Sequence, residues 1–256
     1  MKKTLLITSL LAISTYSFAD IEDCYKAGLA SDETKIEKCS PYAEKDPIAT
    51  GILIGIYAKN ENKEKTLEYS NWIVDYYNKN GIPQNKNEYE GYTYAVYLIG
   101  DIYYFDQNNK ENKTKGLEYI TKAANLGNNF AQNQLGDFYN SNDKFPGLNV
   151  AQSYKWYTLA SANGNTQADQ SGLMSVIDSV TKQAPYCIAM GEQLVAQAYI
   201  DGSAGLPKDN SKAKEYLNQA IALYQDNKPT AENTKYCPTG ADKLNLESAK
   251  KELDSL

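Results

Sequence analysis

The sequence predicts an all-α protein, a right-handed α-solenoid of stacked antiparallel helix pairs with a disulfide at each end. Three observations predict this fold. An alanine–glycine–tyrosine motif recurs after 36 residues, a second helical motif follows each copy, and four cysteines are divided between the first and the last parts of the 256-residue chain. A self-similarity with a period of 20 to 50 residues is typical of helical repeat proteins.

The N-terminal segment 1–19 has the features of a secretory signal peptide. Two lysines precede the apolar stretch 5–13, and residues 17–19 (Ser-Phe-Ala) form a small-x-small cleavage pattern. A buried N-terminal helix would not combine these features. We therefore expect cleavage after Ala19, retention in the periplasm rather than release outside the cell, and one solenoid domain over 20–256. No later stretch approaches the roughly 20 apolar residues that span a bilayer, so no membrane insertion is expected.

The first repeated motif, Ala-x3-[Leu/Ile]-Gly-x2-Tyr, predicts one helix in each copy. Positions four, five and eight residues apart lie on one face of a helix with about 3.6 residues per turn. The small residue in the middle of this buried stripe allows a neighbouring helix to approach closely. Two close copies begin at Ala95 and Ala131, and two looser copies begin at Ala49 and Gly191.

The second motif follows each first one after a polar turn, so the repeating unit is an antiparallel helix pair. The copies of the second motif contain Tyr119, Trp156 and Tyr216. Gly127 and Gly164 are 37 residues apart and stand where a helix ends and a left-handed residue is favoured. Residues 166–182 break the register, so we expect an inserted or distorted helix there, before the next first helix begins near Cys187.

The cysteines predict two disulfides, because their number is even and the chain is expected to reach an oxidising compartment. Of the three possible connectivities we favour Cys24 with Cys39 and Cys187 with Cys237, because repeat arrays make contacts mainly between near neighbours. On loop-entropy grounds each bond would contribute about 3 to 4 kcal/mol, at the two ends of the array.

The composition argues against several classes of function. All 26 basic residues are lysines, and the chain has neither arginine nor histidine. Arginine best matches phosphate with two hydrogen bonds, and histidine is the commonest imidazole acid, base and metal ligand. The net charge of −6 becomes −8 when Lys2 and Lys3 are removed with the signal peptide, which disfavours nucleic-acid binding. We predict no cofactor, no metal site and no histidine-based catalytic triad.

Two segments have the sequence of a known helical repeat. Residues 122–139 contain Lys-Ala-Ala-x2-Gly-x3-Ala-Gln-x2-Leu-Gly-x2-Tyr, and the turn at 199–213 contains Tyr-Ile-Asp-Gly-x2-Gly-Leu-Pro-Lys-Asp-x2-Lys-Ala. Both resemble the Sel-one-like repeat, a relative of the tetratricopeptide repeat. The resemblance extends from about 95 to 224 and is weaker over the first looser copy. It is absent from about 20–46 and 226–256, which are expected to be caps with polar outward faces.

The resemblance implies a protein-binding array without enzymatic activity, because the family is known chiefly for adaptor and regulatory roles. Exported members resemble periplasmic immunity proteins that neutralise phospholipase effectors delivered by type VI secretion. The expected partner is then a secreted lipase or phospholipase, to which an acidic inhibitor would be steered if the toxin is basic. The alternative within the same class is a general adaptor of the cell envelope.

A third hypothesis is an enzyme that hydrolyses β-lactams or cell-wall amides, since some secreted cysteine-rich members of the family are associated with weak β-lactam binding or hydrolysis. Ser-x2-Lys occurs at Ser179, Ser211 and Ser248, but the Ser-Asp-Asn and Lys-Thr-Gly partner motifs are missing. Asp101 and Asp137 each follow a repeat glycine, which would suit an acid–base pair. A solvated face is the simpler interpretation in so acidic a chain.

Tyrosines outside the repeat framework are the better candidates for contact with a partner. Tyrosine is enriched in interface hot spots, but those among the 22 that occupy framework positions are expected to pack inside. In related solenoids the first helices line the concave surface, and the register puts Tyr97, Asn133 and Gln193 in one column, with Asp101, Asp137 and Gln197 in the next. The predicted partner-binding residues are Tyr94, Tyr97, Asp101, Tyr104, Asn133, Asp137, Gln193 and Gln197.

Overall fold

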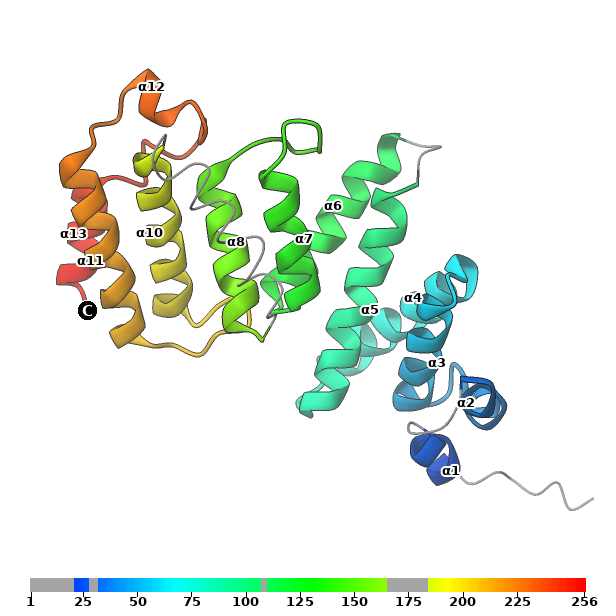
Figure 1. The fold of residues 1–256 in the computed structure, drawn as a ribbon. Helices are drawn as coiled ribbons and strands as arrows, with labels where there is room; N and C mark the ends of the chain where they lie inside the picture. The colour runs from blue at the N-terminus through cyan, green and yellow to red at the C-terminus, as the bar shows by residue number, and fades with distance from the viewer. Residues whose placement is uncertain (1–20, 28–31, 107–109, 165–183) are drawn as a thin grey trace, which may run out of the picture.

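The computed structural model describes residues 21–27, 32–106, 110–164 and 184–256, and all regular structure in these ranges is helical (Figure 1). None of the helices in these ranges is long and apolar enough to cross a membrane. The predicted signal peptide and the predicted irregular helix at 166–182 lie outside the described residues.

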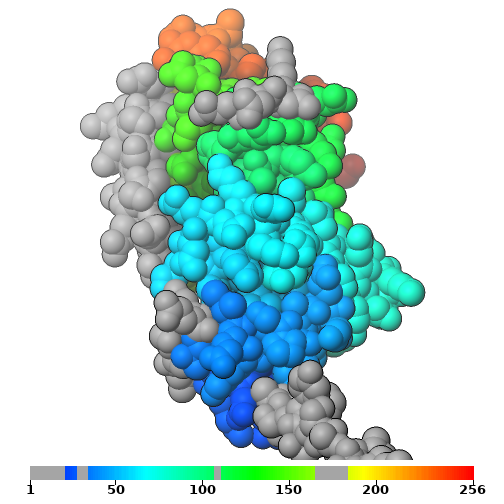
Figure 2. Space-filling model, turned by 90° about the vertical axis from the view of Figure 1, so that its right-hand side faces the viewer, coloured from blue at the N-terminus to red at the C-terminus, as the bar shows by residue number. Residues whose placement is uncertain are grey.

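The described helices form a row of antiparallel pairs, so the predicted helical solenoid is confirmed (Figure 1). The pairs are α3 (Pro47–Lys59) with α4 (Lys63–Asn80), α5 (Lys86–Tyr104) with α6 (Lys110–Asn125), α7 (Asn129–Tyr139) with α8 (Val150–Ala162), and α10 (Pro185–Asp201) with α11 (Asn210–Asp226). Each repeat alanine or glycine lies on the first helix of its pair. Figure 2 shows the stack from its N-terminal side, with the blue and cyan residues of the first pair nearest to the viewer.

Most of these helices begin at an Asn or Asp whose side chain accepts a hydrogen bond from the first turn. Asn128, for example, accepts from the backbone N–H of Ala131, and Asn149 accepts from that of Gln152. Such a cap contributes about 1 kcal/mol because it satisfies a backbone donor that the helix itself leaves unpaired. The helix α10 instead begins with Pro185, whose missing N–H needs no partner.

Glycines permit a close contact between α5 and α6. A Cβ atom on Gly100 would lie 2.7 Å from the backbone nitrogen of Ile120, and one on Gly116 would lie 2.3 Å from that of Tyr104. The two helices therefore pack backbone against backbone, as the small residue of the motif predicts. At the turn between α6 and α7, Gly127 adopts the expected left-handed conformation with φ of 88°.

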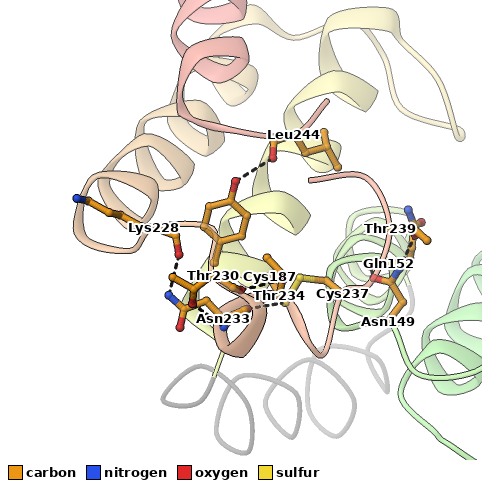
Figure 3. Close-up of a disulfide and its surroundings, with 11 residues drawn as sticks. Asn149, Gln152, Cys187, Lys228, Thr230, Asn233, Thr234, Cys237, Thr239 and Leu244 are labelled. Atoms are coloured by element: carbon orange, nitrogen blue, oxygen red, sulfur yellow. Dashed lines mark hydrogen bonds between the residues drawn. A yellow bond between two sulfur atoms is a disulfide. The ribbon is translucent and has the colours of Figure 1, made fainter. Parts of the chain in front are cut away.

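Disulfides are present at both ends of the array. At the N-terminus, Cys24 of α1 (Ile21–Lys26) is bonded to Cys39 of α2 (Asp32–Cys39), and the short helix η2 (Ser40–Tyr42) leads into α3. At the C-terminus, Cys187 of α10 is bonded to Cys237, which follows α12 (Ala231–Thr234) (Figure 3). We call these bonds the N-terminal disulfide and the C-terminal disulfide.

Hydrogen bonds to α8 and α10 hold the C-terminal segment in place beside the C-terminal disulfide. The backbone N–H of Val150 donates to the carbonyl of Tyr236 at 2.8 Å, and the side-chain amide of Asn149 donates to the Thr239 hydroxyl at 3.3 Å. Figure 3 shows Asn149 and Thr239 of this set near the disulfide. The segment between α11 and the last helix is thus part of the packed array.

The last helix, α13 (Leu246–Asp254), occupies the position of a further first helix. It follows α11 and packs against it, as α7 packs against the preceding α6. Its Ala249 is fully buried, and Leu253 follows four residues later, which is the spacing of the repeat motif. This copy does not match the repeat motif in the sequence, because Asp254 replaces the motif glycine.

Candidate protein-binding surface

An aromatic cluster lies where the first helices α5 and α7 meet. Its members are Tyr94 and Tyr97 from α5 and Phe130 from α7, with ring centroids 5.9 to 6.2 Å apart. Phe130 is 54% exposed, whereas both tyrosines are half-buried. Because the rings already pack against one another, a partner would meet a large apolar surface that loses little side-chain entropy on binding.

Two carboxylates continue the same face beyond the cluster, and each is held by a neighbouring helix. Asp101 of α5 accepts a hydrogen bond from the side-chain amide of Gln134 on α7 at 2.7 Å. Asp137 of α7 accepts one from the hydroxyl of the buried Tyr157 on α8 at 2.5 Å. These bonds fix the direction in which the negative charges face.

The carboxylates also affect the tyrosines beside them. Burial raises the pKa of the Tyr97 hydroxyl, and the charge of Asp101 raises it further. The pKa of Tyr157 is raised by burial and then by its hydrogen bond to Asp137. Both hydroxyls therefore stay protonated at neutral pH and can act as hydrogen-bond donors. Asn133, which is half-buried, completes this part of the face.

Three of the predicted partner-binding residues make contacts within the protein, and two of these, Tyr104 and Gln193, are buried. Tyr104 is only 5% exposed, its ring stacks on Phe138 at 4.0 Å, and its hydroxyl donates to the carbonyl of Phe145. Gln193 is buried beneath α13, and Gln197, which is partly exposed, also contacts α13. Their side-chain amides both donate to Glu252 of α13 at 2.9 Å, and Gln193 is fully buried.

Gln193 and Gln197 contact α13 because both columns point toward the next first helix in the array. Gln134 contacts Asp101 between α5 and α7, and Glu252 contacts Gln197 in the same way between α10 and α13. The column positions thus lie at the seam between successive first helices. These positions are partly exposed between α5 and α7, whereas at the end of the array α13 buries Gln193 and leaves Gln197 partly exposed.

Phe130, the most exposed member of the aromatic cluster, was not predicted from the sequence. It directly precedes the repeat alanine, as do Ile48 and Tyr94 in the two preceding copies. Ile48 is 41% exposed, and the equivalent Met190 of α10 is fully buried. A large apolar residue at this position in each copy was the signal available in the sequence.

Over α3 the first-helix face has no side chains at the column positions, because glycines occupy them. Gly51 and Gly55 stand at the positions of Tyr97 and Asp101, and no atom lies within 4 Å of a Cβ added to either. A hollow of about 320 Å³ lies between α3 and α5 and includes Ile48 among its lining residues. The open first-helix face therefore runs from an apolar hollow at α3 to the cluster and the carboxylates at α5 and α7.

Of the two candidate serines in the described ranges, Ser248 occupies a structural position and Ser211 is exposed. The hydroxyl of Ser248 accepts from the backbone N–H of Asn245 and donates to its carbonyl, so it belongs to the capping box of α13. Ser211 is exposed in the first turn of α11, and Ser179 lies outside the described residues. No group of three or more acidic or cysteine side chains that could hold a metal ion occurs in the described part of the chain.

The fold and this face together define an α-helical solenoid with an open first-helix surface. Comparison with known proteins finds three segments that match the model of the Sel1 repeat, residues 93–128, 129–165 and 186–224. These three repeats constitute a protein-interaction fold. The pair α3–α4 and the helix α13 lie outside the matched segments.

The solved structure of a Sel1 repeat protein from Oxalobacter formigenes is similar to this chain. The two are 18% identical, the match covers 93% of this chain and 95% of that one, and the TM-score is 0.32. No curated protein matches the sequence.

Proposed function

We propose that the protein is a non-enzymatic, protein-binding component of the cell envelope, and that its partner binds across the aromatic cluster. The observation that carries the proposal is the exposed ring of Phe130, held against two tyrosines on neighbouring first helices. Large aromatic side chains dominate the binding energy of protein interfaces. Asp101, Asn133 and Asp137 would form the polar border around them.

The charges favour a partner with an apolar anchor and basic residues around it. Asp101 and Asp137 lie beside the aromatic cluster, and the chain without its first nineteen residues carries a net charge of −8, since Lys2 and Lys3 are lost from a total of −6. An acidic surface attracts a basic partner over long distances and increases the rate of association.

The most concrete form of the proposal is an immunity protein that neutralises a phospholipase-type effector of type VI secretion. A signal peptide cleaved after Ala19 would place the protein in the periplasm, and the two disulfides are typical of an oxidising compartment. The resemblance of the repeats to those of exported immunity proteins supports this role. An envelope adaptor would share the same binding surface but would have several partners.

Affinity capture from a lysate of the parent bacterium tests the proposal. The bait is the disulfide-bonded mature protein, compared with Phe130→Ala and with the control Phe105→Ala. Phe105 suits this comparison because it is 51% exposed and follows the last residue of α5, whereas Tyr94 and Tyr97 lie in the middle of that helix. We expect one tight partner that Phe130→Ala loses and the control retains. A partner with lipase activity supports immunity, several partners support the adaptor, and capture of nothing contradicts protein binding.

A further inference from the structure

A groove of about 950 Å³ lies beside the aromatic cluster. It extends from the first turns of α5 and α7 to the end of α8. Tyr94 and Phe130 line one part of it, and Asn163 and Gly164 line another. This volume is at the upper end of the range of small-molecule sites, which suits an extended ligand.

The lining of the groove is polar but has little net charge. Asn87 and Asn129 present side-chain amides, and the only charged lining residues among those that the structure describes are Lys86 and Glu90. Those two are of opposite sign, and the Lys86 nitrogen lies 3.8 Å from a Glu90 carboxylate oxygen. The groove therefore offers hydrogen-bond donors and acceptors together with aromatic faces, without a charge that would require an ionic ligand.

A buried network of hydrogen bonds holds the walls of the groove in position. The side-chain amide of the fully buried Gln132 donates to the carbonyls of Ala124 and Ala204 at 2.9 Å, and its oxygen accepts from Asn163 at 3.0 Å. The hydroxyl of Tyr89 donates to the carbonyl of Leu126 at 2.9 Å. The turns that form the groove are thus fixed before a ligand arrives, which lowers the entropic cost of binding.

Backbone is accessible in the groove because several of its lining residues are glycines. No atom lies within 4 Å of a Cβ added to Gly91 or to Gly164. The packing of the described residues therefore does not require a glycine at position 91. A glycine within a helix costs about 1 kcal/mol of helix stability relative to alanine. Larger residues at these places would narrow the groove.

We propose that this groove binds an uncharged oligosaccharide that carries acetamido groups. The C–H face of a pyranose ring is slightly positive and packs against the negative face of an aromatic ring, here Phe130 and Tyr94. The amides of Asn87 and Asn129 each offer a donor and an acceptor, which match the amide of an acetamido group and the sugar hydroxyls. This site goes beyond protein binding and shares only Tyr94 and Phe130 with the proposed partner surface.

Titration calorimetry of the disulfide-bonded mature protein with chitohexaose tests the proposal, with cellohexaose as the sugar that lacks acetamido groups. We expect chitohexaose to bind more tightly than cellohexaose. Phe130→Ala should weaken its binding about tenfold, by loss of one aromatic contact. Asn129→Ala should weaken it as well, whereas the control Phe105→Ala should bind as the wild type does.

Three results would overturn the proposal: no binding of chitohexaose, equal binding of the two sugars, or unchanged binding in both groove variants. Circular dichroism of each variant checks that the helices remain folded. Asn129→Ala separates this site from the protein surface, because we expect it to weaken sugar binding without affecting capture of the protein partner. Loss of sugar binding and loss of the protein partner are therefore distinguishable.

Discussion

Glu192 should make the stability of this protein fall as the pH rises, and Glu192→Gln should remove that dependence. Glu192 is buried between helices, and its Oε2 atom makes no hydrogen bond with any residue that the structure describes. Burial raises the pKa of its carboxyl from the ordinary 4.5 to about 8. Tyr154 and Tyr216 are close enough that the Glu192 charge raises their pKa values too.

The sign and size of the effect follow from proton linkage. Between pH 4.5 and 8 the folded state keeps the Glu192 proton and the unfolded state loses it, so the folded state binds more protons and stability falls with rising pH. At about 1.36 kcal/mol per pH unit, the loss between about pH 5 and pH 8 is about 4 kcal/mol. Because the chain has no histidine, few other side chains titrate in this interval.

Urea unfolding followed by circular dichroism at both pH values measures this effect. Glu192→Gln keeps the shape of the protonated side chain, so we expect the variant to match the wild type near pH 5 and to exceed its free energy of unfolding by several kcal/mol near pH 8. Glu215→Gln, on the exposed face of α11, is the control and should keep the pH dependence of the wild type. The reasoning is refuted if Glu192→Gln loses stability between the two pH values as steeply as the wild type does.

Further predictions concern the glycines and the disulfides. Gly116→Ala should destabilise the protein by about 1 to 3 kcal/mol, because its Cβ would lie 2.3 Å from the backbone nitrogen of Tyr104. Gly55 has open space around it, so Gly55→Ala should stabilise the protein by about 1 kcal/mol. Thermal melts in which both glycine variants shift in the same direction would contradict the close contact at Gly116. Replacing both cysteines of the C-terminal disulfide by serine should cost about 4 kcal/mol, because its cysteines are 50 residues apart. The same change at the N-terminal disulfide, with a separation of 15, should cost about 3 kcal/mol; chemical denaturation of both variants checks the order.

The helix pairs were predictable from the sequence because their spacing follows directly from helix geometry. Ala95, Ile99 and Gly100 must share one face of any helix that contains them, whatever packs against it. The left-handed glycines at helix ends were predictable for a similarly local reason, since only glycine adopts that conformation without strain.

The surface was harder to predict, because it depends on how successive pairs rotate relative to one another. The sequence places Gln193 in the same column as Tyr97, but α13 covers Gln193 and does not cover Tyr97. That helix was not recognised because its copy of the motif retains little beyond Ala249 and Leu253. Phe130 was not predictable from tyrosine enrichment, because the position before the repeat alanine holds a different large apolar residue in each copy.

Site-specific photo-crosslinking in the parent bacterium tests most directly whether the first-helix face binds a protein. A photoreactive phenylalanine derivative replaces Asn133, which lies on α7 beside the carboxylates, or Glu215, which is exposed on the second helix α11. We expect a discrete crosslinked protein from position 133 and none from position 215. Crosslinking from 215 alone, or to the same extent from both, would contradict binding at the first-helix face.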